Sequence, residues 1–521
     1  MKINKGLVLS AALVAALLPV LILRDFTPSN ELRYLSIADE AIANGDVFTF
    51  TNQGVPYADK PPLYIWIVML GRLLFGQHTM WFLGLFSLIP ALVIVWTMNR
   101  WVRSVTSEGE RRTASLMLMS SGLFLGLAVV LRMDMLMNMF ITLALYTFYR
   151  IYDGSGDTRR NRILFPVYVF MALFSKGPVG ILVPLVATVA FLAVSRKLRS
   201  IGRYWGWLTW GILLAGCAVW FGSVYIEGGR EYLDNLLFHQ TIDRAVDAFH
   251  HKEPFYYYLI SVWYSIAPWS LLAIAAIVGG CAARKLNTDL ERFFLTIIIT
   301  TFVMLSAFSS KIAVYLAPTF PFFIYLGMLM YLKLGRRWWL TLTVALPTTI
   351  WIIVLPGLFI AAKTAPEMGY LLNGWCVAAG AILCIAGIAA AVLLIRRRDT
   401  LNPAIETLAA GLFAAIFVGG FALPAINCEI GYGDLCRKAA EVSAAEGRPN
   451  YYVWRVHRPE NMDVYLHTDV TDVTTEDVLA GKCADGVLIL PAGKLAGEDA
   501  LSDYTSGKPA HTVGRYMVIE P

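Results

Sequence analysis

Thirteen long apolar runs fill most of the chain, and they constrain its fold more than any other feature. A helix of about 20 apolar residues crosses a bilayer core about 30 Å thick. Because 57% of the 521 residues are apolar and only 15% are charged, the sequence excludes a water-soluble enzyme, a disordered chain, a nucleic-acid-binding protein and a disulfide scaffold. We predict an all-α polytopic membrane protein with thirteen transmembrane helices, at residues 7–23, 79–98, 113–131, 135–150, 163–174, 178–194, 204–221, 255–280, 290–308, 312–332, 337–361, 371–395 and 404–424.

Two of these runs are expected to break at charged residues. As a single helix the run 163–194 would be about 48 Å long, too long for one bilayer. Pro178 cannot continue a helix, and Lys176 is costly in lipid. The same argument divides 113–150 before Asp134. We therefore expect tight turns at Lys176 and at Asp134.

Lys and Arg gather in alternate connections, and this distribution orients the chain. With the N-terminus in the cytoplasm, the cytoplasmic connections hold 23 basic and eight acidic residues. Residues 1–23 resemble a signal peptide but lack an obvious cleavage site, so we interpret them as an uncleaved first helix. The same topology places residues 425–521 outside.

The chain divides into two expected parts. Residues 1–424 form the transmembrane part, whose long outside loops are 24–78 and 222–254. Within the first loop, the apolar stretch Leu63–Phe75 is too short to span and is expected to lie along the membrane interface. Residues 425–521 have the composition of a small soluble α/β domain.

This tail is expected to contain one helix and three strands, at 434–445, 451–456, 486–490 and 515–519. Cys428, Cys436 and Cys483 lie on the oxidising side, so one disulfide is plausible, although the sequence does not choose the pair. The chain contains no nucleotide-binding motif. An enzyme acting outside has no supply of nucleotide sugars, so it must take an activated group from a lipid carrier or use none at all.

Polar residues from the outside segments are expected to converge at the outer mouth of the bundle. Several Lys and Arg at the lipid boundary suit a phosphate head group, and carboxylates beside them suit acid–base chemistry or metal binding. Asp59 with His250 or His251 could hold a divalent metal. The converging residues are Asn30, Glu31, Arg33, Tyr34, Tyr57, Asp59, Lys60, Arg132, Asp134, Lys176, His250, His251, Lys252, Glu253, Lys311 and Tyr315.

Simpler interpretations remain open for single residues in this set. A lone Lys or Arg at the end of a span often reaches to the lipid head groups without binding substrate. Asp134 could merely pair with Arg132, and the His250-His251 pair could be a solvated loop feature.

Several motifs resemble those of the GT-C glycosyltransferases, which are membrane-embedded enzymes that use polyprenyl-phosphate sugars. The resemblance is to the bacterial aminoarabinose transferase branch, related to protein O-mannosyltransferases. The matching segments are Asn30-Glu31-Leu32-Arg33-Tyr34, Tyr57-Ala58-Asp59-Lys60-Pro61-Pro62-Leu63, Ser175-Lys176-Gly177-Pro178, His251-Lys252-Glu253-Pro254-Phe255, and Ser310-Lys311 with Tyr315 and Pro318.

The resemblance implies a bacterial inner-membrane enzyme that moves 4-amino-4-deoxy-L-arabinose from undecaprenyl phosphate to lipid A phosphates at the outer face. It implies that Arg33, Tyr57, Lys60 and Tyr315 hold the carrier phosphate, to which we add Lys176 and Lys311 from their position. It also implies a metal site at Asp59 with His250 or His251, although the family usually has Glu at position 59.

The departure from the family pattern is Asn30, where the family usually has an Asp that is its usual candidate catalytic residue. An amide cannot accept a proton, so a hydroxyl acceptor would need Glu31 or Asp134 as its base. A phosphate acceptor is already anionic and needs none. We therefore expect Asn30, Glu31 and Asp134 at the reacting centre, with transfer to lipid A phosphate as the first interpretation.

Three alternatives remain at this stage: transfer of another sugar to protein or glycan hydroxyls, a lipid-linked sugar transporter, and a binding subunit without activity. Transporters place charges near the membrane midplane and often contain inverted repeats, whereas here the charges cluster at one face.

Overall fold

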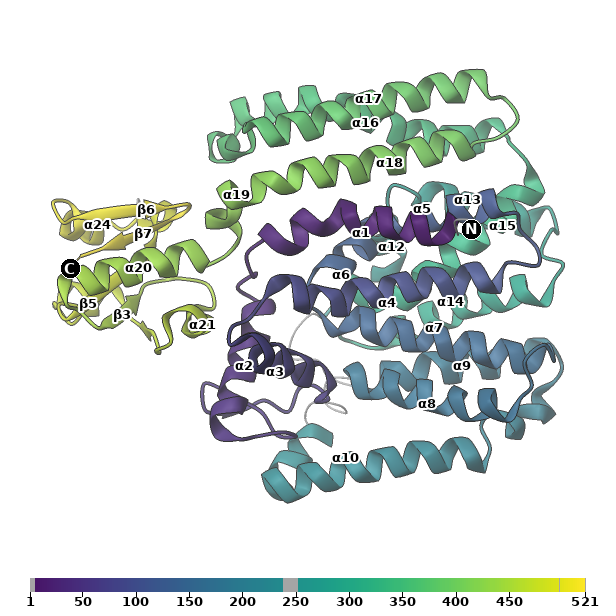
Figure 1. The fold of residues 1–521 in the computed structure, drawn as a ribbon, viewed down its shortest axis with the longest axis horizontal. Helices are drawn as coiled ribbons and strands as arrows, with labels where there is room; N and C mark the ends of the chain where they lie inside the picture. The colour runs from purple at the N-terminus through teal and green to yellow at the C-terminus, as the bar shows by residue number, and fades with distance from the viewer. Residues whose placement is uncertain (1–4, 238–251, 496, 521) are drawn as a thin grey trace.

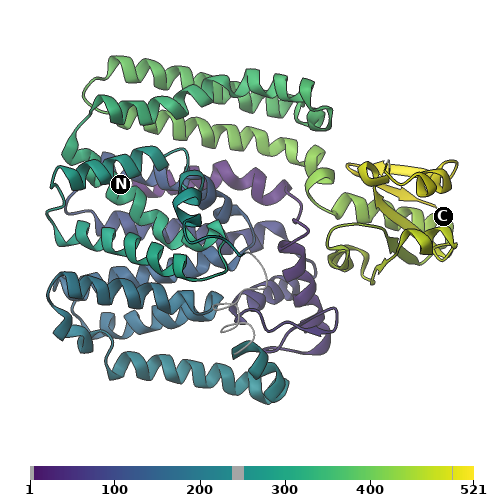
Figure 2. The ribbon, with the colours of Figure 1, turned by 180° about the vertical axis from the view of Figure 1, so that it is seen from behind.

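The protein is described by a computed structural model that covers residues 5–237, 252–495 and 497–520. A bundle of long helices carries a small sheet domain at one end, and the first described residues lie at the opposite end (Figures 1 and 2). The bundle and its loops comprise α1 (Lys5–Leu23), α2 (Glu31–Asn44), β1 (Thr51–Asn52), β2 (Val55–Pro56), α3 (Leu63–Phe75), α4 (Met80–Trp101), α5 (Glu108–Met119), α6 (Gly122–Val129), α7 (Met133–Tyr152), α8 (Arg159–Lys176), α9 (Val179–Val194), η1 (Leu198–Arg203), α10 (Trp207–Asp234), α12 (Tyr257–Ser265), α13 (Ser270–Ala282), α14 (Asp289–Ala307), η3 (Ala313–Thr319), α15 (Phe320–Leu334), α16 (Trp338–Thr364), η4 (Pro366–Leu371), α17 (Gly374–Arg396), α18 (Asn402–Gly419), η5 (Gly420–Ala422) and α19 (Leu423–Ile430).

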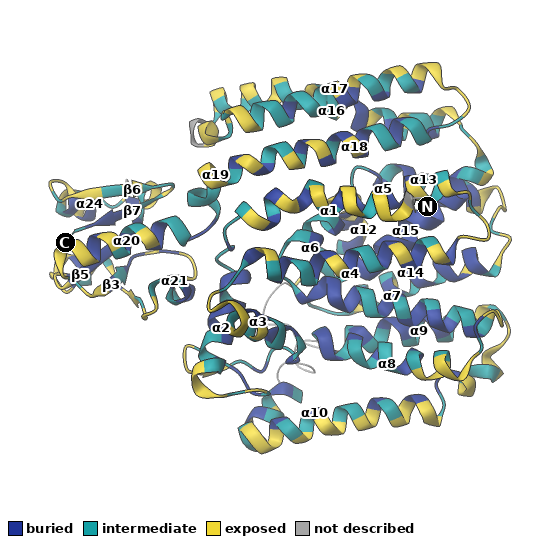
Figure 3. Ribbon diagram, viewed as in Figure 1, coloured by how far each residue is buried: buried dark blue, intermediate teal, exposed yellow. Residues whose placement is uncertain are grey.

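The bundle has the composition of a multi-pass membrane protein. Within the described residues, eight helices are long and apolar enough to cross a bilayer, or up to ten if each bent helix pair counts as one crossing. Exposed large apolar residues occur along α10, α16 and α17. In Figure 3 these helices carry many exposed residues, whereas α7 is largely buried. These exposed faces are suited to contact lipid.

Two predicted crossings are not continuous helices. The stretch predicted at 113–131 contains α5 and α6, which meet at a bend of 72°. The stretch predicted at 255–280 contains α12 and α13, which meet at a bend of 118°. Pro268 lies in the second break and cannot donate a helical hydrogen bond, whereas the first break, at Ser120-Ser121, has no such residue.

The turn expected at Lys176 is present. α8 ends at Lys176, and α9 begins at Val179 after Gly177, whose φ of 108° favours glycine. The two helices then pack closely, because a Cβ placed on Gly180 would lie 2.3 Å from the backbone of Ala172. Lys176 is thereby held at the end of the bundle that carries the C-terminal domain.

The first outer loop folds onto the end of α10. Its helix α2 ends at Gly45, which has a φ of 81°, and α3 has the bounds expected from the sequence. Between them, Glu227 Oε1 accepts hydrogen bonds from the backbone N–H groups of Val47, Phe48 and Thr49 at 2.7–2.9 Å. One carboxylate therefore joins the two long loops.

The C-terminal domain contains a mixed five-stranded sheet in the order β4-β3-β5-β7-β6. β3 pairs in parallel with β4 and β5, whereas β7 is antiparallel to both its neighbours. The short strands β4 and β6 were not expected from the sequence. The elements are α20 (Gly433–Glu446), β3 (Asn450–Val453), η6 (Pro459–Met462), α21 (Asp463–Leu466), β4 (Thr471–Asp472), α22 (Thr475–Leu479), β5 (Gly486–Pro491), α23 (Ala492–Leu495), α24 (Asp499–Thr505), β6 (Ala510–Val513) and β7 (Tyr516–Ile519).

The plausible disulfide is absent, since all seven cysteines are free thiols. Cys436 and Cys483 are buried in different apolar clusters, and Cys428 lies in α19. The cluster around Cys436 also contains Leu32 and Leu35 of α2, so the C-terminal domain and the first outer loop share one core.

Candidate functional site

A buried carboxylate with two cations forms the centre of the candidate site. Asp134, at the start of α7, is only 1% exposed. Lys176 Nζ pairs with its Oδ1, and Arg132 Nε donates to its Oδ2 at 3.0 Å. A charge at this depth is costly unless it is paired, and such residues are commonly functional.

The segment after α14 brings another lysine and a tyrosine to this centre. Lys176 Nζ lies 4.7 Å from the ring centroid of Tyr315 in η3. Lys311 is 4% exposed and donates from Nζ to the carbonyl oxygen of Glu253 at 2.8 Å. Lys252 and Ser310 form an isolated antiparallel bridge, so the end of the second outer loop lies against this segment.

The first turn of α2 supplies Arg33 and Asn30. The Arg33 guanidinium lies 5.6 Å and 5.7 Å from the ring centroids of Tyr34 and Tyr57. Its Nη2 donates to Asn30 Oδ1 at 3.3 Å. The amide of Asn30 therefore orients the Arg33 guanidinium without neutralising its charge. A carboxylate at that position would do both.

Tyr57, Asp59 and Lys60 lie half-buried between the β1–β2 hairpin and α3. Ala58, within this stretch, belongs to an apolar cluster with Phe174 of α8. Because Phe174 is two residues from Lys176, this cluster places the Lys60 stretch beside the end of α8.

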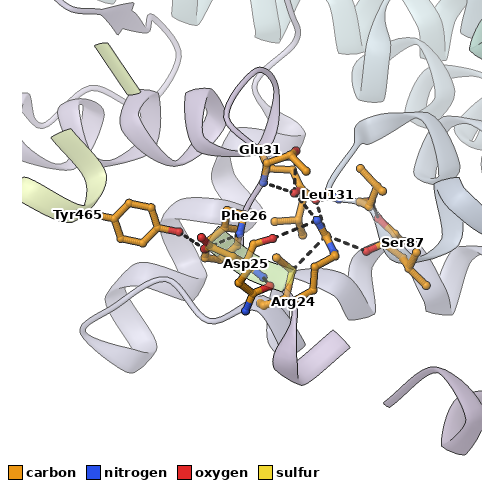
Figure 4. A network of polar contacts seen from close by, with 12 residues as sticks. Arg24, Asp25, Phe26, Glu31, Ser87, Leu131 and Tyr465 are labelled. Carbon is orange, nitrogen blue, oxygen red and sulfur yellow. Dashed lines mark hydrogen bonds and ion pairs between the residues drawn. The ribbon is translucent and has the colours of Figure 1, made fainter. Parts of the chain in front are cut away.

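Glu31, predicted at the reacting centre, has a structural environment instead (Figure 4). It is fully buried, and its two oxygens form hydrogen bonds of 2.7 Å with the two terminal nitrogens of Arg24. The backbone N–H groups of Thr27 and Leu131 donate to it at 2.7 and 2.8 Å, and Thr27 Oγ1 donates at 2.9 Å. A carboxylate with this many donors is suited to hold α2 against the turn that precedes Asp134, and not to accept a proton.

The predicted metal site is only partly described. Asp59 is present, whereas His250 and His251 lie outside the described residues. Among the side chains that the structure places, no group of three or more His, Cys, Asp or Glu residues could hold a metal ion.

Sequence reasoning missed the importance of Arg24. Its Nη2 also donates to the carbonyl oxygen of Val129 at 3.3 Å, so one side chain contacts both α2 and the last residue of α6. The available signal was an Arg-Asp pair directly after an apolar helix and shortly before Asn30.

The arrangement can bind an anion at the boundary of the bundle. Cationic side chains from α2, from the turn before α7, from α8 and from the segment before η3 gather at one end of the molecule. Within the described residues, Asp134 pairs with two of these cations, and its single negative charge leaves the three groups with a net positive charge. A phosphate group with several acceptor oxygens suits the remaining donors.

Known proteins resemble this chain in sequence. Residues 59–221 match the family model described as dolichyl-phosphate-mannose-protein mannosyltransferase. The undecaprenyl phosphate-alpha-4-amino-4-deoxy-L-arabinose arabinosyl transferase of Shewanella sediminis is 25% identical over 61% of this chain, which spans 58% of that relative's length. The enzyme of the same name from Pectobacterium atrosepticum is 25% identical over 75% of this chain and 71% of its own.

The fold also matches a solved structure over the whole chain. The crystal structure of ArnT from Cupriavidus metallidurans bound to undecaprenyl phosphate has a TM-score of 0.76 at 18% identity, covering 100% of this chain and 98% of that one. The chain therefore shares the fold of that protein, which agrees with the GT-C resemblance of the motifs.

Proposed function

We propose that the protein is a glycosyltransferase that takes a sugar from a polyprenyl phosphate carrier, undecaprenyl phosphate in a bacterium. The buried Asp134–Lys176–Arg132 group is the observation that carries the proposal, because it gathers cations where a lipid phosphate would lie. The arabinosyl transferase relatives and the whole-chain fold likeness support the same donor class.

The carrier phosphate is held by the cations around this centre. Lys60, Arg33, Lys176 and Lys311 supply charge, and the hydroxyls of Tyr57 and Tyr315 supply further donors. Asp134 orients Lys176 and Arg132 before the donor arrives, and the phosphate then shares these cations. Stabilising the leaving phosphate in this way accelerates cleavage of its bond to the sugar.

The acceptor that the site fits best is a phosphate, as on lipid A, and the sugar is 4-amino-4-deoxy-L-arabinose. Asn30 cannot act as a base, Glu31 is saturated, and Asp134 is engaged by two cations. An acceptor that is already anionic needs no base. Direct attack of its oxygen on the anomeric carbon would give inversion.

A hydroxyl on a protein or glycan is the second candidate acceptor. The match of residues 59–221 to a protein mannosyltransferase family model favours it. With a hydroxyl acceptor, Asp134 would have to give up its pairing with Lys176 or Arg132 and accept the proton of the hydroxyl.

The membrane topology is part of the proposal. Thirteen crossings result when α7, α8 and α9 are added to the eight long apolar helices and the two bent pairs. The N-terminus then lies in the cytoplasm of a bacterial inner membrane, and the site and the C-terminal domain lie on the periplasmic side. Asp59 with His250 or His251 remains a proposed divalent-metal site, and the proposed transfer does not depend on it.

The test is a transfer assay with the purified protein, an undecaprenyl-phosphate-linked sugar and lipid A. Lys176→Met should lose transfer, and Lys363→Met should not, since Lys363 is an exposed lysine at the end of α16. A lipid A mass spectrum with and without the gene identifies the acceptor. A product on protein or glycan would favour the second candidate, and carrier movement without any new glycosidic product would contradict the transferase.

A further inference from the structure

Two consecutive residues at the end of α1 point to different parts of the molecule. Arg24 forms the ion pair with Glu31, whereas Asp25 accepts hydrogen bonds from the C-terminal domain (Figure 4). Tyr465 Oη donates to Asp25 Oδ1, and Gly433 N donates to Asp25 Oδ2 at 2.7 Å. This dipeptide therefore joins α20 and α21 to the α1–α2 linker.

A continuous series of contacts runs from Asp25 to the candidate site. Arg24 holds Glu31 through two hydrogen bonds of 2.7 Å, and Glu31 accepts from Leu131 N at 2.8 Å. Leu131 directly precedes Arg132, which pairs with Asp134. The position of the carboxylate at the site therefore depends on how the linker is held.

A second set of bonds fastens the C-terminal domain to the same linker and to α2. Asn461 Nδ2 donates to the carbonyl oxygen of Pro28 at 2.9 Å. Ser36 Oγ donates to Asp463 Oδ2 at 2.6 Å. The bonded residues lie on both sides of Asn30 and Arg33, so the domain holds the helix turn that presents them.

The junction at Asp25 has open space on one side and a tightly packed glycine segment on the other. A cavity of about 450 Å³ opens beside it, lined by Arg24, Asp25, Asn427, Asp434, Arg437 and Tyr465. On its other side the carboxylate packs closely, because a Cβ placed on Gly431 would lie 2.1 Å from Asp25 Oδ2. The bonds from Tyr465 and Gly433 therefore fix how the linker sits against the domain.

We propose that the C-terminal domain is a positioning part of the transfer site, which holds the Arg24–Glu31 pair in place through Asp25. The inference rests on the proposed function, because it assigns the domain a role in that transfer. Asp25 and Tyr465 act through other residues and are positioning residues. The domain thereby sets the distance between the first turn of α2 and the turn that begins α7.

The test compares two substitutions in the full-length protein that each remove one Tyr–Asp hydrogen bond from the same domain. Tyr465→Phe removes the bond to Asp25. Tyr452→Phe is the matched control, because Tyr452 Oη donates to Asp485 Oδ1 at 2.7 Å within the domain itself. We expect kcat to fall at least about fivefold in Tyr465→Phe only, with the Kd for undecaprenyl phosphate changed less than about twofold.

Amide hydrogen exchange provides a readout that does not depend on activity. Exchange at residues 27–31 and 129–134 should accelerate in Tyr465→Phe and stay at the wild-type rate in Tyr452→Phe. Asp25→Asn should also accelerate exchange at residues 27–31 and 129–134. This second variant keeps the test valid if Tyr465→Phe does not fold. Equal kcat and equal exchange in Tyr465→Phe and its control would overturn the inference.

The two proposals fail in different ways. If the wild-type protein transfers no sugar from any polyprenyl phosphate, the proposed function is wrong, and exchange alone then decides whether the domain positions these turns. If the wild type is active and Tyr465→Phe behaves as Tyr452→Phe does, only the positioning role is wrong.

Discussion

Buried carboxylates lie at both ends of the helix bundle, and their partners differ. At the end that carries the C-terminal domain, Asp134 pairs with Lys176 and Arg132. At the opposite end, Glu291 of α14 is 3% exposed and pairs with Lys333 at 2.5 Å. Glu291 Oε2 also accepts from the backbone N–H groups of Asn287 and Thr288, at 3.0 and 3.1 Å, as part of a capping box.

The difference separates a carboxylate that stabilises the fold from one available for function. Glu291 satisfies backbone donors that the start of a helix leaves open, so its burial serves the helix. Asp134, within the described part of the chain, accepts only from cationic side chains. Those cations can be shared with an incoming anion, whereas backbone donors of a helix end cannot leave it.

The largest expected effect comes from removing the cation beside Asp134. Lys176→Met should lower kcat for transfer by about 10²–10³-fold, as removal of one preorganised charge commonly does. The double variant Lys176→Met/Asp134→Asn removes both charges and should keep the fold while remaining inactive. Activity of the double variant near the wild-type rate would show that the pair is only structural.

A mixed effect is expected at Glu31, which shares features of both carboxylates. Glu31→Gln places an amide where only donors point, so it should lower the free energy of unfolding by about 2–3 kcal/mol. Because the Leu131 contact is weakened, kcat should also fall about tenfold. Thermal unfolding and turnover of the same preparation measure the loss of stability and the loss of kcat. A stable Glu31→Gln protein with normal turnover would show that the Arg24–Glu31 pair supports neither the fold nor the site.

At the opposite end, Glu291→Gln should change stability alone. Loss of the pair with Lys333 and weakening of the capping box should lower the free energy of unfolding by about 1–2 kcal/mol. Turnover per folded molecule should match the wild type. A large loss of turnover in a folded Glu291→Gln protein would contradict the division between the two ends.

The smallest effect is a pH dependence of the interface between α2 and the C-terminal domain. Burial raises the pKa of Asp463 to about 6, and the charges of Asp39 and Asp469 act in the same direction against the bond from Ser36. Since the folded state holds this proton more tightly, the stabilisation is full below pH 3.8 and is lost as the pH rises through about 6.

Asp463→Asn should remove this dependence. Between pH 4.5 and 7 the unfolding midpoint of the wild type should fall by roughly 2–4 °C more than that of Asp463→Asn. Parallel pH profiles of the two proteins would show that Asp463 does not titrate in this window.

The features that the sequence could predict were set by local signals. Lys176 and Pro178 interrupt an apolar run and predicted the turn between α8 and α9, which is present. The apolar stretch Leu63–Phe75, expected in the first loop, forms α3 with these bounds. The charges of Lys176, Asp134 and Arg132 also marked residues that the fold brings together.

The features that escaped prediction depend on long-range contacts. The Leu131 N–H that saturates Glu31 is 100 residues away in the chain, and Tyr465 is 440 residues from Asp25. The bend at Ser120-Ser121 leaves the apolar pattern unbroken, so composition could not distinguish it from a straight helix. The catalytic role of Glu31 stays a prediction, but the donors that surround it could not be foreseen, because they are brought together only by the fold.

The central claim is that the cations around Asp134 bind the phosphate of a lipid carrier. Titration of undecaprenyl phosphate into the wild type, Lys176→Met and Lys363→Met tests it most directly. The account predicts that Kd rises at least about tenfold in Lys176→Met and stays at the wild-type value in Lys363→Met. Equal affinity of all three proteins for the carrier would contradict it.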